Sequence, residues 1–500
     1  SKISTGITKD IRNDIFKKAQ EFSHTEYDEF GVSSMITRTT NDPFVILQFT
    51  NTLLKMALIT PVMFTISLVM ILKTSLSLSL VLAVVIPIII LGVILIAKTS
   101  EPLSEKLQKR LDKLNRISRE NLTGIRVIRA FGNEKYEEKR FDETNESYAE
   151  VAKKLNKLMA ISQPLFFFLL NIAIIVIFWI SSKMINVGTL QVGQLVAFIE
   201  YLFHAMFSIM LFSMVFVMYP KAQVSANRIM EVLNTEPIIK SPKNGIKDTE
   251  NKGTIEFENV SFTYPNGEEP VIKDVSFSGK KGEVIAFIGS TGSGKSTLIN
   301  LIPRFYDVTK GSIKIDGVDV RDYDLKYLRE KIGFIPQKTL LFTGSIANNI
   351  KFGKKDAEYK EVEDSAKIAQ AYEFISNKPN KFDELITEGG SNVSGGQKQR
   401  LSIARAIVRK PDIYIFDDSF SALDFKTDAI LRKELRSETK DAIVLIVAQR
   451  IGSIMDADKI IVLNEGEVVG IGTHKELIKN CSIYHEIATS QLTEEELANE

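Results

Sequence analysis

Four long apolar runs in the first 220 residues limit the folds that this chain can adopt. They extend over residues 56–72, 76–97, 164–180 and 195–218. Each run is long enough to cross a bilayer as a helix, which takes about 17 to 25 residues. One such run fits a buried helix of a soluble protein, but four in one region favour a membrane domain. We therefore predict an all-α transmembrane domain over residues 1–220, with spans near 53–73, 76–98, 160–182 and 191–219.

The basic residues orient these spans. Fifteen Lys and Arg lie from Lys98 to Lys157, whereas Lys73 alone lies between the first two spans and Lys183 alone between the last two. Loops rich in Lys and Arg stay on the cytoplasmic side. The long loop, the N-terminal segment and the C-terminal domain are therefore expected in the cytoplasm, and the protein in the cell (inner or plasma) membrane.

Composition excludes several classes of partner. The net charge is +1 and no block of Lys and Arg stands out, so a nucleic-acid partner is not expected. Cys481 is the single cysteine, which excludes an internal disulfide and a CxxC metal pair. The four histidines lie too far apart in the sequence to suggest a metal site.

Since the chain begins at Ser1 with charged helical sequence, we expect a shortened chain.

Residues 1–52 and 98–160 carry apolar residues at helical spacing among dense charge, which predicts long amphipathic helices that extend the spans into the cytoplasm. Residues 22–31 and 122–132 interrupt these helices. Each stretch is either an ordinary helix turn or a short bend that docks on a partner domain.

A polar segment rich in Pro, Gly and Asn predicts a linker over residues 221–253. Beyond it, β-rich pieces such as "TIEFENVSFTY" alternate with helical ones. This alternation predicts an α/β domain over residues 254–490 with a mostly parallel sheet. Residues 491–500 remain as a C-terminal tail.

The strongest chemical signal follows a buried-strand pattern, "EVIAFIG", at residues 283–289. It runs into "GSTGSGKST" and then into helical sequence, which is the strand–loop–helix context of a phosphate-binding loop. Backbone N–H groups and the helix N-terminus bind phosphate oxygens. Lys295 is expected to reach the β- and γ-phosphates of ATP, and Ser296 to ligate Mg²⁺. The predicted nucleotide-binding residues of this loop are Gly289, Ser290, Thr291, Gly292, Ser293, Gly294, Lys295, Ser296 and Thr297.

Three further stretches identify the class of phosphate-loop protein. They read "FIPQ" at residues 334–337, "VSGGQ" at 393–397, and "IYIFDD" at 413–418 followed by "SALD". In this order the set resembles the ATP-binding cassette (ABC) ATPases. The resemblance implies that two cassettes dimerise head to tail, with each ATP between one chain's phosphate loop and the other chain's signature segment. The signature residues that would contact the partner's ATP are Ser394, Gly395, Gly396 and Gln397.

The resemblance extends over the whole chain, which is similar to a multidrug-type ABC exporter half-transporter. That family has six spans, so the first span and most of the second are absent here, as in an N-terminally truncated type I/IV exporter fold. The stretches that begin at Phe22 and Leu122 would be the two coupling-helix regions. The implied partners are a second half-transporter, membrane lipid and a small hydrophobic substrate.

Further site residues follow from the resemblance. Tyr264 would stack on adenine, and Gln337 would sense Mg²⁺ and link to the coupling helices. The Mg²⁺ ligands would be Ser296, Gln337 and Asp417. Asp424 of "SALD" would bridge the two ATP sites.

Two catalytic positions depart from the family pattern. A Glu usually follows the Mg²⁺ aspartate, and a His follows about thirty residues later, but this chain has Asp418 and Gln449 there. A carboxylate one methylene shorter sets the base back by about 1.5 Å, and a misplacement of that size can cost on the order of 100-fold in rate. Because the signature is intact apart from Val393 in place of Leu, we expect the weakly hydrolytic half of a heterodimer, which completes a competent site on its partner.

Glu200 and His204 lie four residues apart in the last span. Ionisable groups inside a membrane usually face a bundle interior or a wet cavity, which predicts a role in the substrate path. The alternative is that they pair with each other and serve packing alone.

The sequence leaves the cargo open among amphipathic drugs, lipids and peptides. Two alternatives to a heterodimeric pump also stay open. One is a regulatory membrane subunit gated by ATP, and the other is a homodimeric exporter with slow turnover.

Overall fold

The structure, a computed structural model, describes residues 2–249, 253–265 and 267–492. It divides into two compact units. The first comprises the chain up to Ile15 together with Thr37–Glu231, and the second comprises Phe16–Ile36 and the chain from Val232 onward. Each unit is described by itself.

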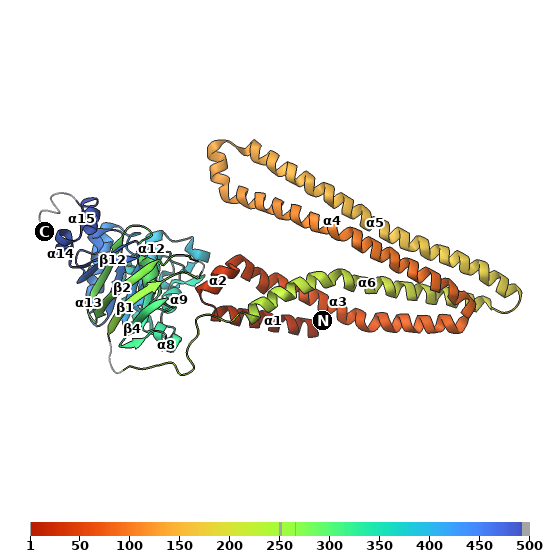
Figure 1. The fold of residues 1–500 in the computed structure, drawn as a ribbon, viewed down its shortest axis with the longest axis horizontal. Coiled ribbons are helices and arrows are strands. Elements are labelled where there is room, and N and C mark those ends of the chain that lie inside the picture. The colour runs from red at the N-terminus through yellow and green to blue at the C-terminus, as the bar shows by residue number, and fades with distance from the viewer. Residues whose placement is uncertain (1, 250–252, 266, 493–500) are drawn as a thin grey trace. The chain divides into compact units, whose positions relative to one another are not determined.

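Long helices make up the first unit (Figure 1). They are α1 (Lys2–Glu21), α3 (Val32–Thr74), α4 (Leu76–Phe131), α5 (Glu134–Asn186) and α6 (Val192–Asn234), of which α1, α3 and α6 extend into the second unit. The helices α3, α4 and α5 and residues Val192–Phe212 of α6 are each long and apolar enough to cross a membrane. Side chains such as Leu80 and Trp179 point outward from these helices, 68% and 66% exposed, so most of their apolar surface is left for lipid or for other protein.

Local signals end these helices. The Ser75 side chain accepts a hydrogen bond from the Leu78 amide and so caps the start of α4. At the other end of α4, Gly132 adopts the left-handed conformation, with φ at 62°, and the chain turns into α5. The predicted interruption at residues 122–132 therefore falls at Gly132, and helix α4 continues up to Phe131.

Helices α3 and α6 are joined near their charged ends. The Asp42 side chain is buried, and its Oδ1 accepts a hydrogen bond of 2.9 Å from Ser225 Oγ and lies 3.7 Å from Arg228 Nη1. One turn earlier in α3, Arg38 pairs with Glu231 at 2.7 Å and donates to the Arg228 carbonyl. These contacts hold together two helices about 190 residues apart in the sequence.

A six-stranded sheet forms the centre of the second unit, in the order β12-β11-β3-β10-β9-β6. All neighbouring pairs are parallel except β11 with β12. The strands are β12 (Glu467–Gly472), β11 (Lys459–Asn464), β3 (Val284–Gly289), β10 (Ile443–Val447), β9 (Ile413–Asp417) and β6 (Ile332–Ile335). Side chains alternate between two apolar cores, so that Tyr414 and Phe416 enter one and Ile413 and Ile415 the other.

A second, antiparallel sheet has the order β2-β1-β4-β5, which the sequence analysis did not anticipate. Its strands are β1 (Thr254–Phe262), β2 (Ile272–Lys280), β4 (Lys310–Ile315) and β5 (Val318–Asp319). Two further short strands, β7 (Gly344–Ser345) and β8 (Leu385–Ile386), form a separate two-stranded sheet. Asp316 and Gly317, both at positive φ, form the two-residue turn between β4 and β5. Short turns of this kind join antiparallel neighbours, which is why a parallel sheet alone does not account for the domain.

Helices surround these sheets (Figure 1). They are α7 (Lys295–Asn300), α8 (Leu325–Glu330), α9 (Ile346–Lys351), α10 (Tyr359–Ile368), α11 (Tyr372–Ser376), α12 (Gly395–Ile407), α13 (Phe425–Glu438), α14 (His474–Asn480) and α15 (Ser482–Thr489), with 3₁₀ turns at Lys381–Asp383, Glu388–Gly390 and Ile451–Ser453. Of the predicted tail, residues 493–500 lie outside the described part of the chain.

Helix α2 (His24–Phe30) and the connection after α6 also belong to the second unit. Ser23 and Glu26 form a capping box at the start of α2. The Glu26 carboxylate, in a residue only 2% exposed, also accepts a hydrogen bond of 2.9 Å from the Ile238 amide. These hydrogen bonds hold the pKa of Glu26 below its usual value although burial opposes them. The carboxylate thus ties α2 to the connection.

The segment expected to be a linker, residues 221–253, is structured over much of its length. Residues 221–234 continue helix α6. Further along, the Lys240 carbonyl accepts a hydrogen bond from Arg304, and Ile246 exchanges backbone hydrogen bonds with Asp322 and Asp324. We call residues 236–249 the strap, because they lie bound along the surface of the second unit.

A buried ion pair supports the turn between β4 and β5. Lys331 Nζ lies 2.9 Å from Asp316 Oδ2 and 2.9 Å from Asp412 Oδ2, with the Lys331 and Asp316 side chains almost fully buried. The same Asp316 accepts hydrogen bonds from the Gly253 and Thr254 amides. One carboxylate thus holds the start of β1 against the turn.

Replacing Lys331 with Met should destabilise the second unit by about 3–5 kcal/mol, because Asp316 would be left buried without its cation. Thermal unfolding of the purified chain measures this as a lower midpoint. Lys326→Met is the matched control, since the Lys326 side chain in α8 is 87% exposed. Equal midpoints for the two variants would contradict the prediction.

Candidate functional site

The candidate site lies at the carboxyl ends of three adjacent parallel strands. In the sheet, β10 lies between β3 and β9, and Val447 pairs with Phe287 on one side and Asp417 on the other. The loops after these strands therefore start at one edge. They carry the glycine-rich loop, Asp418 and Gln449.

The glycine-rich loop is shaped by positions that only glycine fits. Gly289 has φ at 156°, and a Cβ there would come within 2.0 Å of the Leu463 carbonyl oxygen. Gly294 has φ at 94°, and a Cβ there would meet Ile272 Cδ1 at 2.6 Å. These contacts bring the loop backbone close to the sheet, and α7 begins directly after it at Lys295. Free backbone amides at such a turn bind anions.

Lys295 is buried at the centre of this loop. Its Nζ donates to the carbonyl oxygens of Gly289 and Ser290 at 2.8 and 2.7 Å. Burial lowers the pKa of Lys295, and the carboxylates of Asp418 and Asp417 oppose that effect. The loop thus holds a cation against its carbonyl oxygens, and a cation at this place suits a polyphosphate.

Ser296 and Asp417 form an oxygen pair beside Lys295. Ser296 Oγ donates to Asp417 Oδ1 at 2.8 Å, and burial raises the pKa of the Asp417 carboxyl. The described residues contain no group of three or more His, Cys, Asp or Glu side chains that could hold a metal ion by themselves. Mg²⁺ is bound by one or two carboxylates together with substrate phosphates, so Ser296 and Asp417 fit that ion, which would neutralise phosphate charge there.

Asp418 has an unusual conformation and two amide donors. Its φ is 47°, in the left-handed region that Asp tolerates better than most residues. Gln337 Nε2 and Gln449 Nε2 both donate to Asp418 Oδ2, at 3.1 and 2.8 Å. Burial raises the pKa of Asp418, and the Gln337 amide and the charges of Lys295 and Arg450 oppose it. The structure thus brings Gln337, Asp418 and Gln449 into one cluster.

Tyr264 lies beside the end of the glycine-rich loop. Its hydroxyl is 3.0 Å from Thr297 Oγ1, and its ring makes edge contacts with Phe262 and Tyr306 at centroid distances of 4.9 and 5.3 Å. An aromatic ring is therefore held next to the loop.

The signature segment begins helix α12. Ser394 and Gln397 form a capping box, with the Ser394 amide donating to Gln397 Oε1 at 3.1 Å. Ser394 and Gly395 are exposed to solvent. Asp424, also exposed, caps α13 by accepting a hydrogen bond from the Thr427 amide, which lowers the pKa of Asp424. Both elements face outward, where a second chain can reach them.

Glu200 and His204 are paired on α6. His204 Nε2 lies 3.4 Å from Glu200 Oε1, and both side chains are exposed. The two side chains are thus close enough to pair, which does not decide between the two roles considered for these residues.

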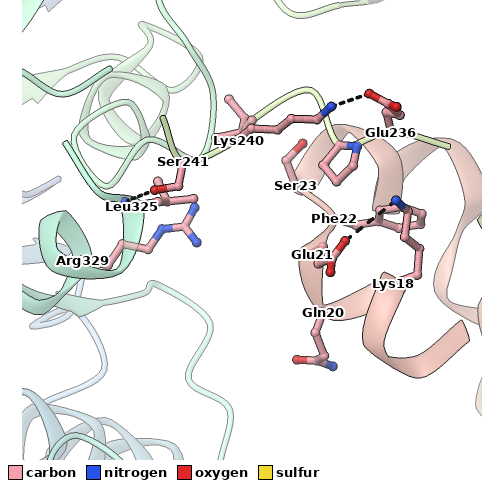
Figure 2. Close-up of a pocket in the computed structure, with 12 residues that line it drawn as sticks. Lys18, Gln20, Glu21, Phe22, Ser23, Glu236, Lys240, Ser241, Leu325 and Arg329 are labelled. Carbon is pink, nitrogen blue, oxygen red and sulfur yellow. Dashed lines mark hydrogen bonds and ion pairs between the residues drawn. The ribbon is translucent and has the colours of Figure 1, made fainter. Parts of the chain in front are cut away.

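A cavity of about 410 Å³ lies apart from the glycine-rich loop (Figure 2). It is bordered by the end of α1, the strap and α8, with Phe22, Ser23, Lys240 and Arg329 around it. None of the predicted nucleotide-binding residues lines it.

Sequence reasoning missed Tyr306 and Arg450, which contact or influence the predicted site residues Tyr264 and Asp418, and it missed Asp28, which acts on Tyr306. Arg450 directly follows Gln449, so its place next to a predicted site residue could have identified it. Tyr306 and Asp28 could not be linked from the sequence, because they are 278 residues apart and no sequence pattern connects them.

The comparisons with known proteins cover nearly the whole chain. Residues 1–217 match the family described as ABC transporter transmembrane region, and residues 272–421 match the family described as ABC transporter. The chain is 39% identical over 493 residues to the ABC transporter ATP-binding protein YfiB of Bacillus subtilis, covering 99% of this chain and 85% of that protein. It is 33% identical over 487 residues to the putative multidrug export ATP-binding/permease protein YgaD of the same organism, covering 96% and 83%.

A solved structure of a bacterial Atm1-family ABC exporter with ATP bound superposes with a TM-score of 0.85. The sequences are 25% identical, and the match covers 99% of this chain and 86% of the other. The predicted fold class, a helical transmembrane domain followed by an α/β ATPase domain, is thereby confirmed. The prediction of a multi-pass membrane protein with a cytoplasmic ATPase domain is also confirmed. The chain belongs to the ABC transporter family, as an exporter half that joins a transmembrane region to an ABC ATPase domain.

Proposed function

We propose that this exporter half works in a heterodimer, in which its own ATP site hydrolyses weakly and its signature segment completes a competent site on the partner. The observation that carries the proposal is the cluster of Gln337, Asp418 and Gln449, in which two amides donate to one carboxylate oxygen. Mg-ATP held at the weak site would keep the two ATPase domains associated between cycles.

The chemistry of the cluster supports weak hydrolysis. Asp418 has one methylene fewer than Glu, so its oxygens lie about 1.5 Å further from a γ-phosphate fixed by the loop. Two amide donors on Oδ2 also compete with a water for that oxygen. Gln449 cannot carry a proton or a positive charge to the phosphate, because its amide does not titrate.

The residues of the site that would bind ATP, unlike Asp418 and Gln449, match the family pattern. Lys295, Ser296 and Asp417 lie together at the glycine-rich loop, and the capped start of α12 is exposed. Such a chain is suited to bind ATP and to supply its signature to another chain's nucleotide. This division of roles favours a pump over a subunit that is only regulatory.

The proposed cargo is an amphipathic or hydrophobic molecule, whether drug, lipid or peptide. The transmembrane helices present Phe, Met and Leu side chains, among them Phe203, Phe207 and Met214 on α6. One relative bears a name that describes putative multidrug export. The Glu200–His204 pair is a candidate for contact with a polar part of such a cargo.

Restoring the usual pair with Asp418→Glu and Gln449→His should raise steady-state ATPase activity by on the order of 10- to 100-fold, since the base regains its reach. The assay uses the chain in lipid nanodiscs, alone and with candidate second half-transporters. Asp418→Asn, of equal size, is the control that should not gain activity. Full activity of the unmodified chain alone would mean that the short aspartate suffices and that no heterodimer is needed.

Within the assembled pair, Ser394→Ala should reduce ATP hydrolysis far more than Lys295→Ala, because the signature serves the competent site and the loop serves the weak one. Ser394 also caps a helix, and losing a cap costs about 1 kcal/mol. Ser345→Ala controls for this, since Ser345 caps α9 in the same way. Equal losses for Ser394→Ala and Lys295→Ala would indicate two equivalent sites instead.

If Glu200 and His204 line the substrate path, Glu200→Gln and His204→Ala should each reduce the stimulation of ATPase by cargo several-fold and leave basal ATPase unchanged. A panel of amphipathic dyes in nanodiscs measures that stimulation. Unchanged stimulation in both variants would assign the pair to packing alone.

A further inference from the structure

The last described turn of the chain reaches the loop that carries Gln449. Gln491 follows helix α15, and its Nε2 donates a hydrogen bond of 2.8 Å to the Gln449 carbonyl oxygen. Its Oε1 accepts a hydrogen bond of 2.8 Å from the Ile451 amide. One side-chain amide thus uses both of its polar ends on the backbone of the two residues that flank Arg450. These two residues lie 42 and 40 positions earlier in the sequence.

The segment that Gln491 bridges lies between two fixed points. Before it, the Ala448 amide donates to the Phe287 carbonyl oxygen, which extends the pairing of β10 with β3. After it, Ile451 is fully buried and begins the 3₁₀ turn. Gln449 and Arg450 between these points are exposed, and exposed loop residues are the least firmly held part of a fold. The hydrogen bonds to Gln491 therefore fix the backbone from which the Gln449 side chain leaves the sheet.

The direction of the Gln449 side chain decides whether it reaches Asp418. Gln449 Nε2 donates to Asp418 Oδ2 at 2.8 Å. The Asp418 amide donates to the Val447 carbonyl oxygen at 3.0 Å, so Asp418 is itself tied to the end of β10. A rotation of the backbone at Gln449 would therefore change the distance between the two side chains without moving Asp418.

Gln491 extends from a firmly packed helix. Tyr484 and Ala488 of α15 are fully buried, and the Tyr484 hydroxyl lies 2.6 Å from His474 Nδ1 in α14. The amides of Gln491 and Leu492 both donate to the Ala488 carbonyl oxygen, where the helix ends. The Leu492 side chain packs against the apolar core that contains Ala488. Gln491 is thus held by the helix end before it and by Leu492 after it.

We propose that Gln491 is a positioning residue of the ATP site: its amide fixes the backbone of residues 449–451 and so places the side chain at position 449 against Asp418. Through this contact the C-terminal helix influences hydrolysis. The proposal rests on the proposed function, in which residues 418 and 449 set the rate of hydrolysis at this chain's own site. Lys295 and Ser296 follow a different strand, β3, so Gln491 acts on the rate of hydrolysis and not on the affinity for ATP.

The variant Gln491→Met keeps the length of the side chain and removes both hydrogen bonds. Hydrogen–deuterium exchange of the full chain in nanodiscs, followed by mass spectrometry of peptides that span residues 447–454, shows how firmly the segment is held. Exchange at Ile451 should be several-fold faster in the variant, because this amide loses its acceptor. Unchanged exchange would mean that Gln491 does not hold the segment, and the inference would be overturned.

Steady-state ATPase kinetics separate the placement of residue 449 from the binding of ATP. Gln491→Met is measured in the unmodified chain and in the chain with Asp418→Glu and Gln449→His, and the faster of these two backgrounds is used for the comparison. The variant should lower kcat about tenfold, because a displaced group stabilises the transition state less well. KM for ATP should stay unchanged, since an interaction made only in the transition state lowers kcat and kcat/KM equally. A change in KM alone would contradict the inference.

Thr489→Val is the matched control in the same helix. The Thr489 hydroxyl donates to the carbonyl oxygens of His485 and Glu486, both within α15. The substitution therefore removes a polar group near the end of the chain without removing a bond to the Gln449 loop. Exchange at Ile451 and kcat should both stay as in the parent chain. If this variant reproduces the effects of Gln491→Met, general loosening of α15 is the cause and the inference is wrong.

The inference and the proposed function fail in different ways. If Asp418→Glu with Gln449→His raises ATPase activity while Gln491→Met leaves kcat unchanged, the inference is wrong and the proposed function stands. If the unmodified chain alone is fully active, the proposed function fails, and a loss of kcat in Gln491→Met of that chain still supports the inference. If neither background hydrolyses ATP, residues 418 and 449 do not control hydrolysis and both are overturned.

Discussion

The parallel pairing of β3, β10 and β9 fixes where the glycine-rich loop, Asp417, Asp418 and Gln449 lie relative to one another. Val447 pairs with Asp417 on one neighbour and with Phe287 on the other. Successive residues of a strand point to opposite faces, so a slip of one residue would move Asp417 out of reach of Ser296. The two apolar cores prevent that slip, because each strand buries alternate side chains in both. Packing of the sheet and placement of the site are thus one constraint.

The negative charges of Asp417 and Asp418 are balanced by neighbouring side chains rather than by solvent. Two adjacent carboxylates, Asp417 and Asp418, would repel each other in isolation. Ser296 donates to the first and two glutamine amides donate to the second. Lys295 and Arg450 supply positive charge nearby. A site built in this way keeps its geometry with little rearrangement when further charge enters.

Local patterns in the sequence predicted the parts of the site that depend on local conformation. The glycines at 289 and 294 are required by backbone geometry, and the capping box at Ser394 lies within four residues, so both could be inferred from spacing. The antiparallel sheet was missed although β1 and β2 alternate buried and exposed residues, which is the pattern of an antiparallel sheet with one solvated face. The contact of Tyr306 with α2 depends on tertiary packing alone, and no periodicity reports it. Helix α6 continues beyond the predicted boundary because residues 221–234 are good helix formers despite their polar character.

The strap changes how the connection between the two units is to be understood. Ile238, Lys240, Ile246 and Thr249 each make hydrogen bonds to other parts of the second unit. A segment bound at so many points offers a protease little backbone to engage, and it has no slack to absorb inserted residues. Fluorescent reporters or protease sites intended for this chain therefore do not belong in the strap, although its composition of Pro, Gly, Asn and Lys makes it look like a tether.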